Sequence, residues 1–146
     1  LVVGDGSLRE NLKFKIKNLK LQDNVLLWGW AKDTSEIASL LNQSKLLVMT
    51  SYNEGGPRVV LEAMACGVPV LATSVGIIGD IIKAGESGEI IDWDSRDIAK
   101  KIFDLLSNQV KQEVYKVAGI KIAAQFEKRT MIKNYAEQLK SLKTND

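Results

Sequence analysis

Two glutamates, Glu54 and Glu62, flank a short loop that could bind an anion. The loop consists of Gly55, Gly56 and Pro57. Glycine lets a ligand approach the backbone closely, and proline suits the first position of a helix, where its missing N–H has no partner. The N–H groups of Arg58 and Val59 would then point outward, and the helix dipole would favour a phosphate there.

The two carboxylates narrow the chemistry of that ligand. At close range they would repel a diphosphate, but they could accept hydrogen bonds from hydroxyl groups farther along the same molecule. A nucleotide-sugar carries a diphosphate between ribose and sugar hydroxyls, so it matches this layout. The plainer alternative is that Glu54 is a loop charge favoured by the helix dipole, worth roughly 0.3–1 kcal/mol, and that Glu62 lies on a solvated helix face.

The elements that must position these residues alternate along the chain. Short apolar runs predict strands over residues 1–3, 25–28, 46–49, 70–73 and 89–91. Helical patterns are predicted over residues 7–21, from 33, and over 58–66, 77–83, 95–107, 110–125 and 127–142. This alternation predicts an α/β fold with a doubly wound, Rossmann-like parallel sheet, in which ligands bind at the carboxyl ends of the strands. We expect residues 1–146 to form a single domain.

Several local patterns predict how these elements pack. Ser7 has the spacing of a capping box, and Asp33 can cap the second helix. One of Trp28 and Trp30 is expected to face the core, and Cys66 is interpreted as a small core residue. The apolar run 46–49 is typical of a strand buried on both faces. The inward face of the first helix is predicted to contain Leu8, Leu12, Ile16 and Leu19.

Composition excludes several kinds of site. The 146 residues carry a net charge of +2, which gives no electrostatic case for a nucleic-acid partner. The chain has no histidine and one cysteine, which excludes a His-ligated metal, a Ser-His or Cys-His nucleophile, an internal disulfide and a Cys-cluster metal site. No apolar run approaches the roughly 20 residues of a membrane-spanning helix. We expect a cytoplasmic protein.

Two short motifs invite other interpretations. Gly4 and Gly6 form a G-x-G turn, but Arg9 stands where a dinucleotide fingerprint needs its third glycine. The turn is either a plain tight turn or one that borders a ligand. Asp92 and Asp94 form a D-x-D triplet, which some sugar-transferring enzymes use to hold a metal; we predict turn and capping chemistry without metal instead.

The segment from Glu54 to Val70 resembles the nucleotide-sugar-binding, C-terminal half of the large family of retaining GT-B glycosyltransferases. The resemblance rests on the spacing of the two glutamates, with seven residues between them, and on the Ala-Met-Ala-Cys-Gly-Val-Pro-Val sequence that follows. Weaker similarities extend it from Leu1 to about Tyr135. It implies transfer of a hexose from a UDP-sugar, or alternatively a GDP-sugar, with retention of configuration and without a metal or other cofactor.

The resemblance also implies roles for particular residues. Glu62 would bind the ribose hydroxyls, and Glu54 would face the transferred sugar as the candidate catalytic residue. The backbone from Gly56 to Val59 would cradle the diphosphate, so that leaving-group stabilisation carries much of the chemistry. The predicted base-bordering residues are Trp30, Ala31, Lys32 and Asp33. The possible loop contacts are Gly4, Gly6 and Gly76.

The chain departs from the family pattern in three ways. Gly76 is present, but Ile77, Gly79 and Asp80 replace the rest of the usual Gly-Gly-Pro-Glu loop. The strand and helix that supply a diphosphate-gripping Arg and Lys, and the N-terminal acceptor domain, are not in this chain. We therefore expect a fragment of a two-domain enzyme that is inactive alone. Its sheet is expected to lack a central strand, the position being open, filled by another segment, or closed by pairing of strands 1–3 and 46–49.

Two other functions remain as alternatives to a sugar-transferring enzyme. One is a non-catalytic, flavodoxin-like nucleotide-binding or signalling module, although the chain shows no acidic cluster of the kind that a phospho-receiver domain carries at its strand ends. The other is a degenerate, truncated product without activity. If the parent protein builds a surface polysaccharide or glycolipid, it could associate peripherally with the inner face of a membrane.

Overall fold

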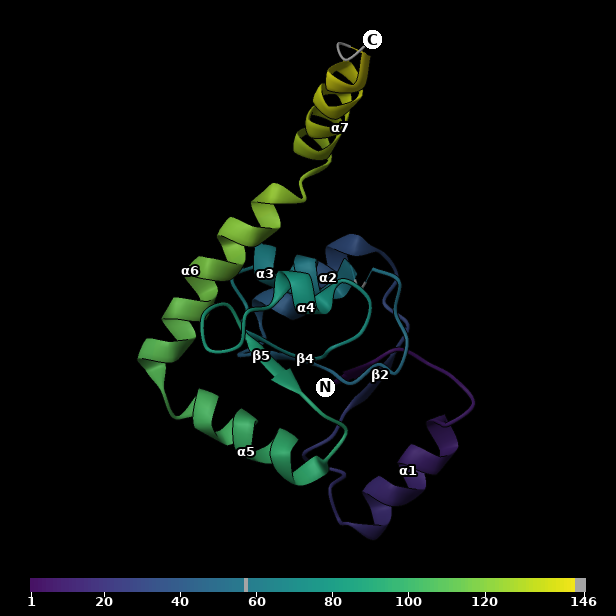
Figure 1. Ribbon diagram of the computed structural model, residues 1–146. Coiled ribbons are helices and arrows are strands. Elements are labelled where there is room, and N and C mark those ends of the chain that lie inside the picture. The colour runs from purple at the N-terminus through teal and green to yellow at the C-terminus, as the bar shows by residue number, and fades with distance from the viewer. Residues whose placement is uncertain (57, 144–146) are drawn as a thin grey trace. The chain divides into compact units, whose positions relative to one another are not determined.

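The computed structural model describes residues 1–56 and 58–143, and the chain divides into two compact units, Leu1–Ser39 and Leu40–Asp146 (Figure 1). Both units combine parallel strands with helices, as the predicted α/β class requires. None of the helices within the described residues is both long enough and apolar enough to cross a membrane.

Unit 1 is built around two parallel strands, β1 (Val2–Val3) and β2 (Leu27–Gly29). Beyond the ladder, Gly4 donates its backbone N–H to the carbonyl oxygen of Gly29 at 2.7 Å. The same unit contains α1 (Arg9–Asn18) and the start of α2 (Thr34–Asn42). Asp33 accepts a hydrogen bond from the backbone N–H of Glu36 at 2.9 Å, so its predicted capping role is confirmed.

Three packing predictions for unit 1 are wrong. Leu8, not Ser7, is the N-cap of α1, and no side chain caps this helix. No residue of α1 is buried, and Leu8 and Leu19 are 70% and 67% exposed, because a two-stranded sheet offers too little surface to bury a helix face. Trp28 and Trp30 are both exposed, so neither lies in a core; the Trp28 indole N–H instead donates to Glu36 at 3.3 Å.

Unit 2 contains a three-stranded parallel sheet in the order β3 (Leu47–Met49), β4 (Val70–Thr73) and β5 (Glu89–Ile91). The central strand β4 is buried at all four positions. The prediction that strand 46–49 is buried on both faces is wrong except at Met49, since β3 has a neighbour on one side only among the described residues. Each strand is followed by a helix: α3 (Arg58–Ala65), α4 (Ile78–Ile81) and α5 (Ser95–Leu106).

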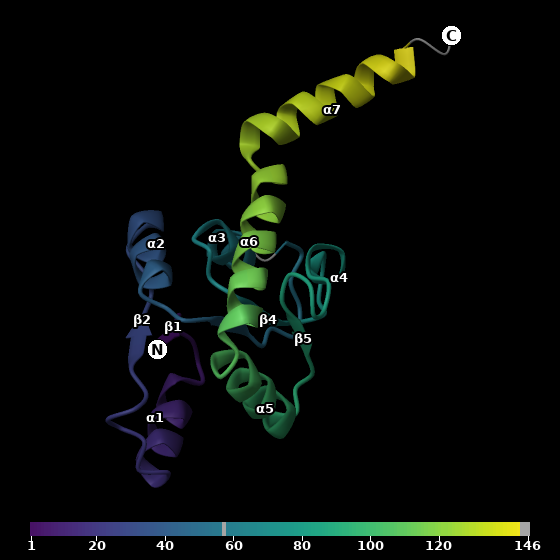
Figure 2. The same cartoon turned by 90° about the vertical axis from the view of Figure 1, so that its left-hand side faces the viewer.

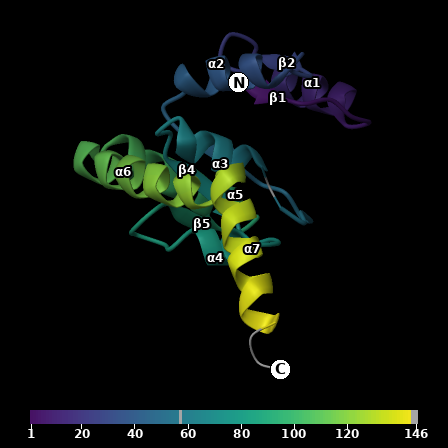
Figure 3. The same ribbon diagram turned by 90° about the horizontal axis from the view of Figure 1, so that it is seen from above.

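Two longer helices complete unit 2: α6 (Gln109–Gln125) and α7 (Lys128–Lys143). Helices α5 and α6 meet at a sharp turn, where Asn108 caps α6 (Figure 2). Helix α6 lies alongside α3, and Gly119 allows this approach because a Cβ there would stand 3.2 Å from the Met64 side chain (Figure 3). The core beneath α5 and α6 contains Leu71, Ile91, Leu105 and Tyr115.

The strand pairs within each unit are parallel, as the predicted doubly wound class requires. Strand β1 pairs with β2, while β3 pairs with β4 and β4 with β5, all in parallel. The alternative in which the strand at 1–3 pairs directly with the strand at 46–49 would join the two units, and it stays a prediction. The chain divides into two compact units, and the prediction that residues 1–146 form a single domain stays a prediction.

Candidate functional site

The loops that follow β3 and β4 are joined at the carboxyl end of the unit 2 sheet. Thr73, the last residue of β4, is fully buried and donates its hydroxyl hydrogen to the carbonyl oxygen of Ser51 at 2.7 Å. Ser51 in turn donates its hydroxyl to a carboxylate oxygen of Glu54 at 3.0 Å. This chain of hydrogen bonds holds the half-buried Glu54 side chain at the strand ends.

Gly76 supports the same loop from the other side. Its φ is +54°, and a Cβ built on it would stand 2.2 Å from the carbonyl oxygen of Glu54 and 3.1 Å from that of Gly55. Any other residue would therefore displace the Glu54 loop. The structure places Gly76 against this backbone, and its contact with a ligand stays a prediction.

The predicted anion site lies where the loop enters α3. Helix geometry leaves the first-turn N–H groups, those of Arg58 and Val59 among them, without partners inside the helix. Gly55 and Gly56 are exposed, and among the described residues no atom other than those of their chain neighbours lies within 4 Å of a Cβ built on either, so a ligand has room to approach. Pro57 lies outside the described residues.

Glu62 projects from the second turn of the same helix. Its carboxylate lies 3.5 Å from the guanidinium of Arg58, one turn earlier, and its side chain is 30% exposed. The Arg58 side chain is 81% exposed, so this ion pair is weak and open to exchange for ligand hydroxyls. The β3–α3 loop and α3 thus bring together a hydrogen-bonded glutamate, a helix N-terminus and a second, half-buried glutamate.

The other predicted site residues lie in unit 1, at the carboxyl ends of β1 and β2. Gly6 donates its N–H to the side chain of Asp5 at 2.8 Å, and Asp5 also pairs with Arg9 at 3.1 Å. After β2, the backbone N–H of Lys32 donates to Glu36 at 2.6 Å, which fixes the turn before α2. The residues of this turn are Trp30, Ala31, Lys32 and Asp33. Their role beside a base stays a prediction.

The D-x-D triplet caps a helix. Asp94 is the N-cap of α5 and accepts hydrogen bonds from the N–H groups of Arg96 and Asp97, at 2.6 and 3.1 Å. The capping prediction is confirmed. Across residues 1–56 and 58–143, no three acidic or cysteine side chains gather as a set of metal ligands. Cys66, predicted to be a core residue, is half-buried.

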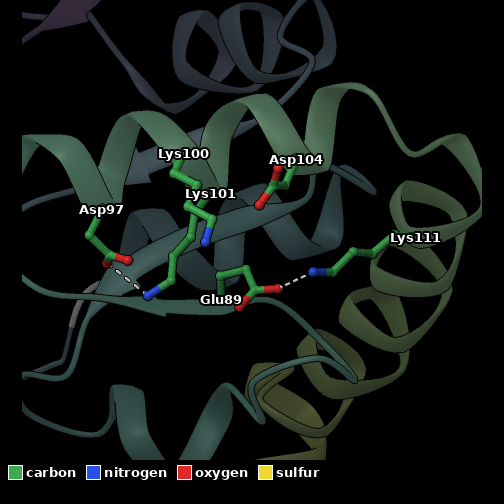
Figure 4. Close-up of a pocket in the computed structure, with 6 residues that line it drawn as sticks. All are labelled: Glu89, Asp97, Lys100, Lys101, Asp104 and Lys111. Carbon is green, nitrogen blue, oxygen red and sulfur yellow. Dashed lines mark hydrogen bonds and ion pairs between the residues drawn. The ribbon is translucent and has the colours of Figure 1, made fainter.

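A charged cavity of about 210 Å³ lies away from this site, at the amino end of β5 (Figure 4). It is lined by Glu89, Asp97, Lys100, Lys101, Asp104 and Lys111. Lys111 pairs with Glu89 at 2.5 Å, and Lys101 pairs with Asp97 at 2.8 Å. Three lysines and three carboxylates therefore largely neutralise one another, which argues against a diphosphate site.

Partly buried hydrogen bonds shift the pKa values of Glu89, Lys111 and Tyr115. Burial would raise the pKa of Glu89, but hydrogen bonds from Lys111 and Tyr115 outweigh it and hold the pKa below its ordinary value. The hydrogen bond to Glu89 raises the pKa of Lys111. Burial, reinforced by Glu89, raises the pKa of Tyr115 to about 12. We assign these residues to stabilising α5 and α6 on β5.

Sequence reasoning missed three residues that make contacts between the loops after β3, β4 and β5. Thr73 was recognised only as a strand residue, although a threonine at a strand end could have signalled a bond to the neighbouring loop. Tyr52 and Trp93 stack on each other from the loops after β3 and β5, with ring centroids 4.8 Å apart. Nothing in the spacing of residues so far apart along the chain signals that contact.

Known proteins share this chain's sequence and fold. N-acetyl-alpha-D-glucosaminyl L-malate synthase of Bacillus anthracis is 36% identical over 110 residues, 75% of this chain and 28% of that protein. UDP-Gal:alpha-D-GlcNAc-diphosphoundecaprenol alpha-1,3-galactosyltransferase of Escherichia coli is 28% identical over 138 residues, 88% of this chain and 34% of the enzyme.

A solved structure, HepE of Anabaena in complex with UDP and glucose, superposes with a TM-score of 0.84 at 28% identity. The superposition covers 95% of this chain and 39% of HepE, so the chain spans between 28% and 39% of the length of these three proteins. This likeness confirms the predicted α/β fold of GT-B type. Residues 1–140 match the family described as Glycosyl transferases group 1, and the chain belongs to that family.

Proposed function

We propose that the chain is the donor-binding part of a retaining glycosyltransferase that transfers a hexose from a UDP-sugar. The observation that carries the proposal is the pair of glutamates, Glu54 and Glu62, on either side of the N-terminus of α3. HepE of Anabaena, solved with UDP and glucose, and the E. coli enzyme, whose name includes UDP-Gal, favour UDP over GDP.

The proposed chemistry follows from the charges at this site. Transfer breaks the bond between the anomeric carbon of the sugar and a diphosphate oxygen, and negative charge grows on that oxygen. Outward-facing N–H groups at the start of α3, with the helix dipole, would stabilise that charge. Glu54 would face the sugar, and Glu62 would accept hydrogen bonds from the ribose hydroxyls in place of Arg58.

The residues of unit 1 have a separate proposed role. The turn from Trp30 to Asp33 would border the base, and Gly4 and Gly6 would contact the ligand through their backbone. Alanine at Trp30 should then change the preference between UDP and other nucleoside diphosphates, and should leave the effect of Glu62→Ala unchanged.

Calorimetry tests the donor assignment. UDP should bind with and without a metal chelator, and GDP should bind more weakly. If neither nucleotide binds the folded protein, the assignment fails. If a chelator abolishes binding, a metal is required, and Asp92 and Asp94 become candidate metal ligands. The flavodoxin-like alternative is not favoured, because the chain belongs to a glycosyltransferase family.

The proposal also covers what sugar transfer requires besides this chain. Since the chain spans between 28% and 39% of the length of the three proteins compared above, we propose that transfer needs an acceptor domain besides residues 1–146. The 146-residue chain should then bind donor and transfer no sugar, whereas sugar transfer by this chain alone would contradict the proposal. The expected cytoplasmic location and peripheral membrane association stay predictions, which cell fractionation would test.

A further inference from the structure

Two exposed aromatic rings join loops that belong to different strands. Tyr52, after β3, and Trp93, after β5, stack with their ring centroids 4.8 Å apart and their planes within 1° of parallel. Tyr52 is 78% exposed and Trp93 is 45% exposed, so neither ring is part of the core. Their contact therefore needs an explanation other than core packing.

Trp93 is held firmly from the helix that follows it. Asp94, the next residue, accepts two hydrogen bonds from the first turn of α5. Trp93 thus directly precedes a residue anchored to α5, and it offers a fixed surface to Tyr52.

Tyr52 lies on the loop that carries Glu54. The inner side of that loop is fixed by β4 and its loop, through the Thr73 hydrogen bond to Ser51 and the close approach of Gly76. The stack on Trp93 is a separate attachment, to the loop after β5. With it, the short segment before Glu54 is held from two neighbouring loops.

We propose that Trp93 is a positioning residue: by stacking on Tyr52 it fixes the loop that carries Glu54, and so strengthens binding of the donor sugar more than binding of the nucleotide. The proposal rests on the role of Glu54 given under the proposed function. Neither ring belongs to α3, where the phosphate and ribose contacts are proposed. An aromatic stack contributes enough to change affinity by roughly two- to twelvefold.

The experiment compares Trp93→Ala, Trp93→Phe and a control, Phe103→Ala, which removes another exposed aromatic ring from the neighbouring α5. Binding of UDP is measured beside the tightest-binding sugar nucleotide among UDP-glucose, UDP-galactose and UDP-N-acetylglucosamine. Trp93→Ala should weaken the sugar nucleotide about three- to tenfold and UDP less than about twofold. Trp93→Phe, which keeps a ring, should recover most of the loss. Equal weakening of both ligands, or none, would overturn the proposal.

Amide hydrogen exchange of residues 51–56 without ligand tests the stack independently of donor binding. Trp93→Ala should raise exchange in this segment, whereas Trp93→Phe and Phe103→Ala should leave it as in the unaltered protein. If the unaltered protein binds no nucleotide, the proposed function fails. The exchange measurement still tests whether the stack of Tyr52 on Trp93 fixes residues 51–56. Unchanged exchange in a folded Trp93→Ala variant would refute the positioning role.

Discussion

The backbone of Gly76 lies so close to Glu54 that a Cβ on Gly76 would stand 2.2 Å from the Glu54 carbonyl oxygen. Gly76 also has a φ of +54°, which other L-residues rarely adopt. The loop after β4 is therefore shaped to support the loop that carries the candidate catalytic carboxylate.

Replacing Gly76 by alanine should displace the Glu54 loop. The left-handed backbone alone costs roughly 1–2 kcal/mol, and the contact with the Glu54 carbonyl adds to it. We expect a lower free energy of unfolding, measured by denaturant titration, and weaker binding of sugar nucleotide. Gly79→Ala, inside α4, is the matched control, since its Cβ would lie 3.4 Å from the hydroxyl oxygen of Ser74, at an ordinary contact distance. If Gly76→Ala binds donor as well as Gly79→Ala does, Gly76 does not support the site.

Replacing Thr73 by valine should weaken the attachment of the Glu54 loop to β4. The change keeps the side-chain shape but removes the hydroxyl that donates to Ser51, and the carbonyl left unpaired costs about 1–3 kcal/mol. Thr73→Ser keeps the hydroxyl and should lose much less. Thermal unfolding of both variants measures the difference. Equal stability of the valine and serine variants would show that this hydrogen bond contributes little.

The charged cluster at β5 should make stability fall in acid. The pKa of Glu89 is below its ordinary 4.5 in the folded chain, so its stabilising contribution is present above about pH 4.5 and is lost as the pH falls through the folded pKa. Tyr115→Phe removes a hydrogen bond to this carboxylate and should cost about 1.5–3 kcal/mol near neutral pH. Unfolding curves at pH 7 and pH 3 check the sign, because the cost should shrink at pH 3.

Tyr115 should also limit stability in alkali. Its pKa is raised from 10 to about 12, so the folded chain keeps the phenol proton that the unfolded chain loses. Stability should therefore fall as the pH rises from 10 through 12. Tyr115→Phe should reduce this decline, although Lys111, whose pKa is also raised, contributes to the same slope. A decline of equal steepness in the phenylalanine variant would argue against the tyrosine as its source.

The sequence predicted the elements of this fold better than their burial. Alternating strand and helix patterns located β4, β5 and α3 within one or two residues, because apolar runs and the Gly-Pro signals are local. The exposure of Leu8 and Leu19 could not be predicted, since a helix pattern shows which face is apolar and not whether another element covers it. At the candidate site, the two glutamates were predicted from their spacing, and their roles stay a proposal. Thr73 and Trp93 make contacts between distant segments, which no local pattern records.

The most direct test of the central claim is the affinity of UDP and of a UDP-sugar for Glu62→Ala and Glu54→Ala, measured by calorimetry with Glu113→Ala on α6 as the control. Glu62→Ala removes charge-assisted hydrogen bonds worth roughly 1.5–3 kcal/mol, so UDP should bind about ten- to a hundredfold more weakly. Glu54→Ala should leave UDP binding nearly unchanged and weaken only the UDP-sugar. Equal losses of UDP affinity in both variants would contradict the division of roles, and no loss in either would contradict the site itself.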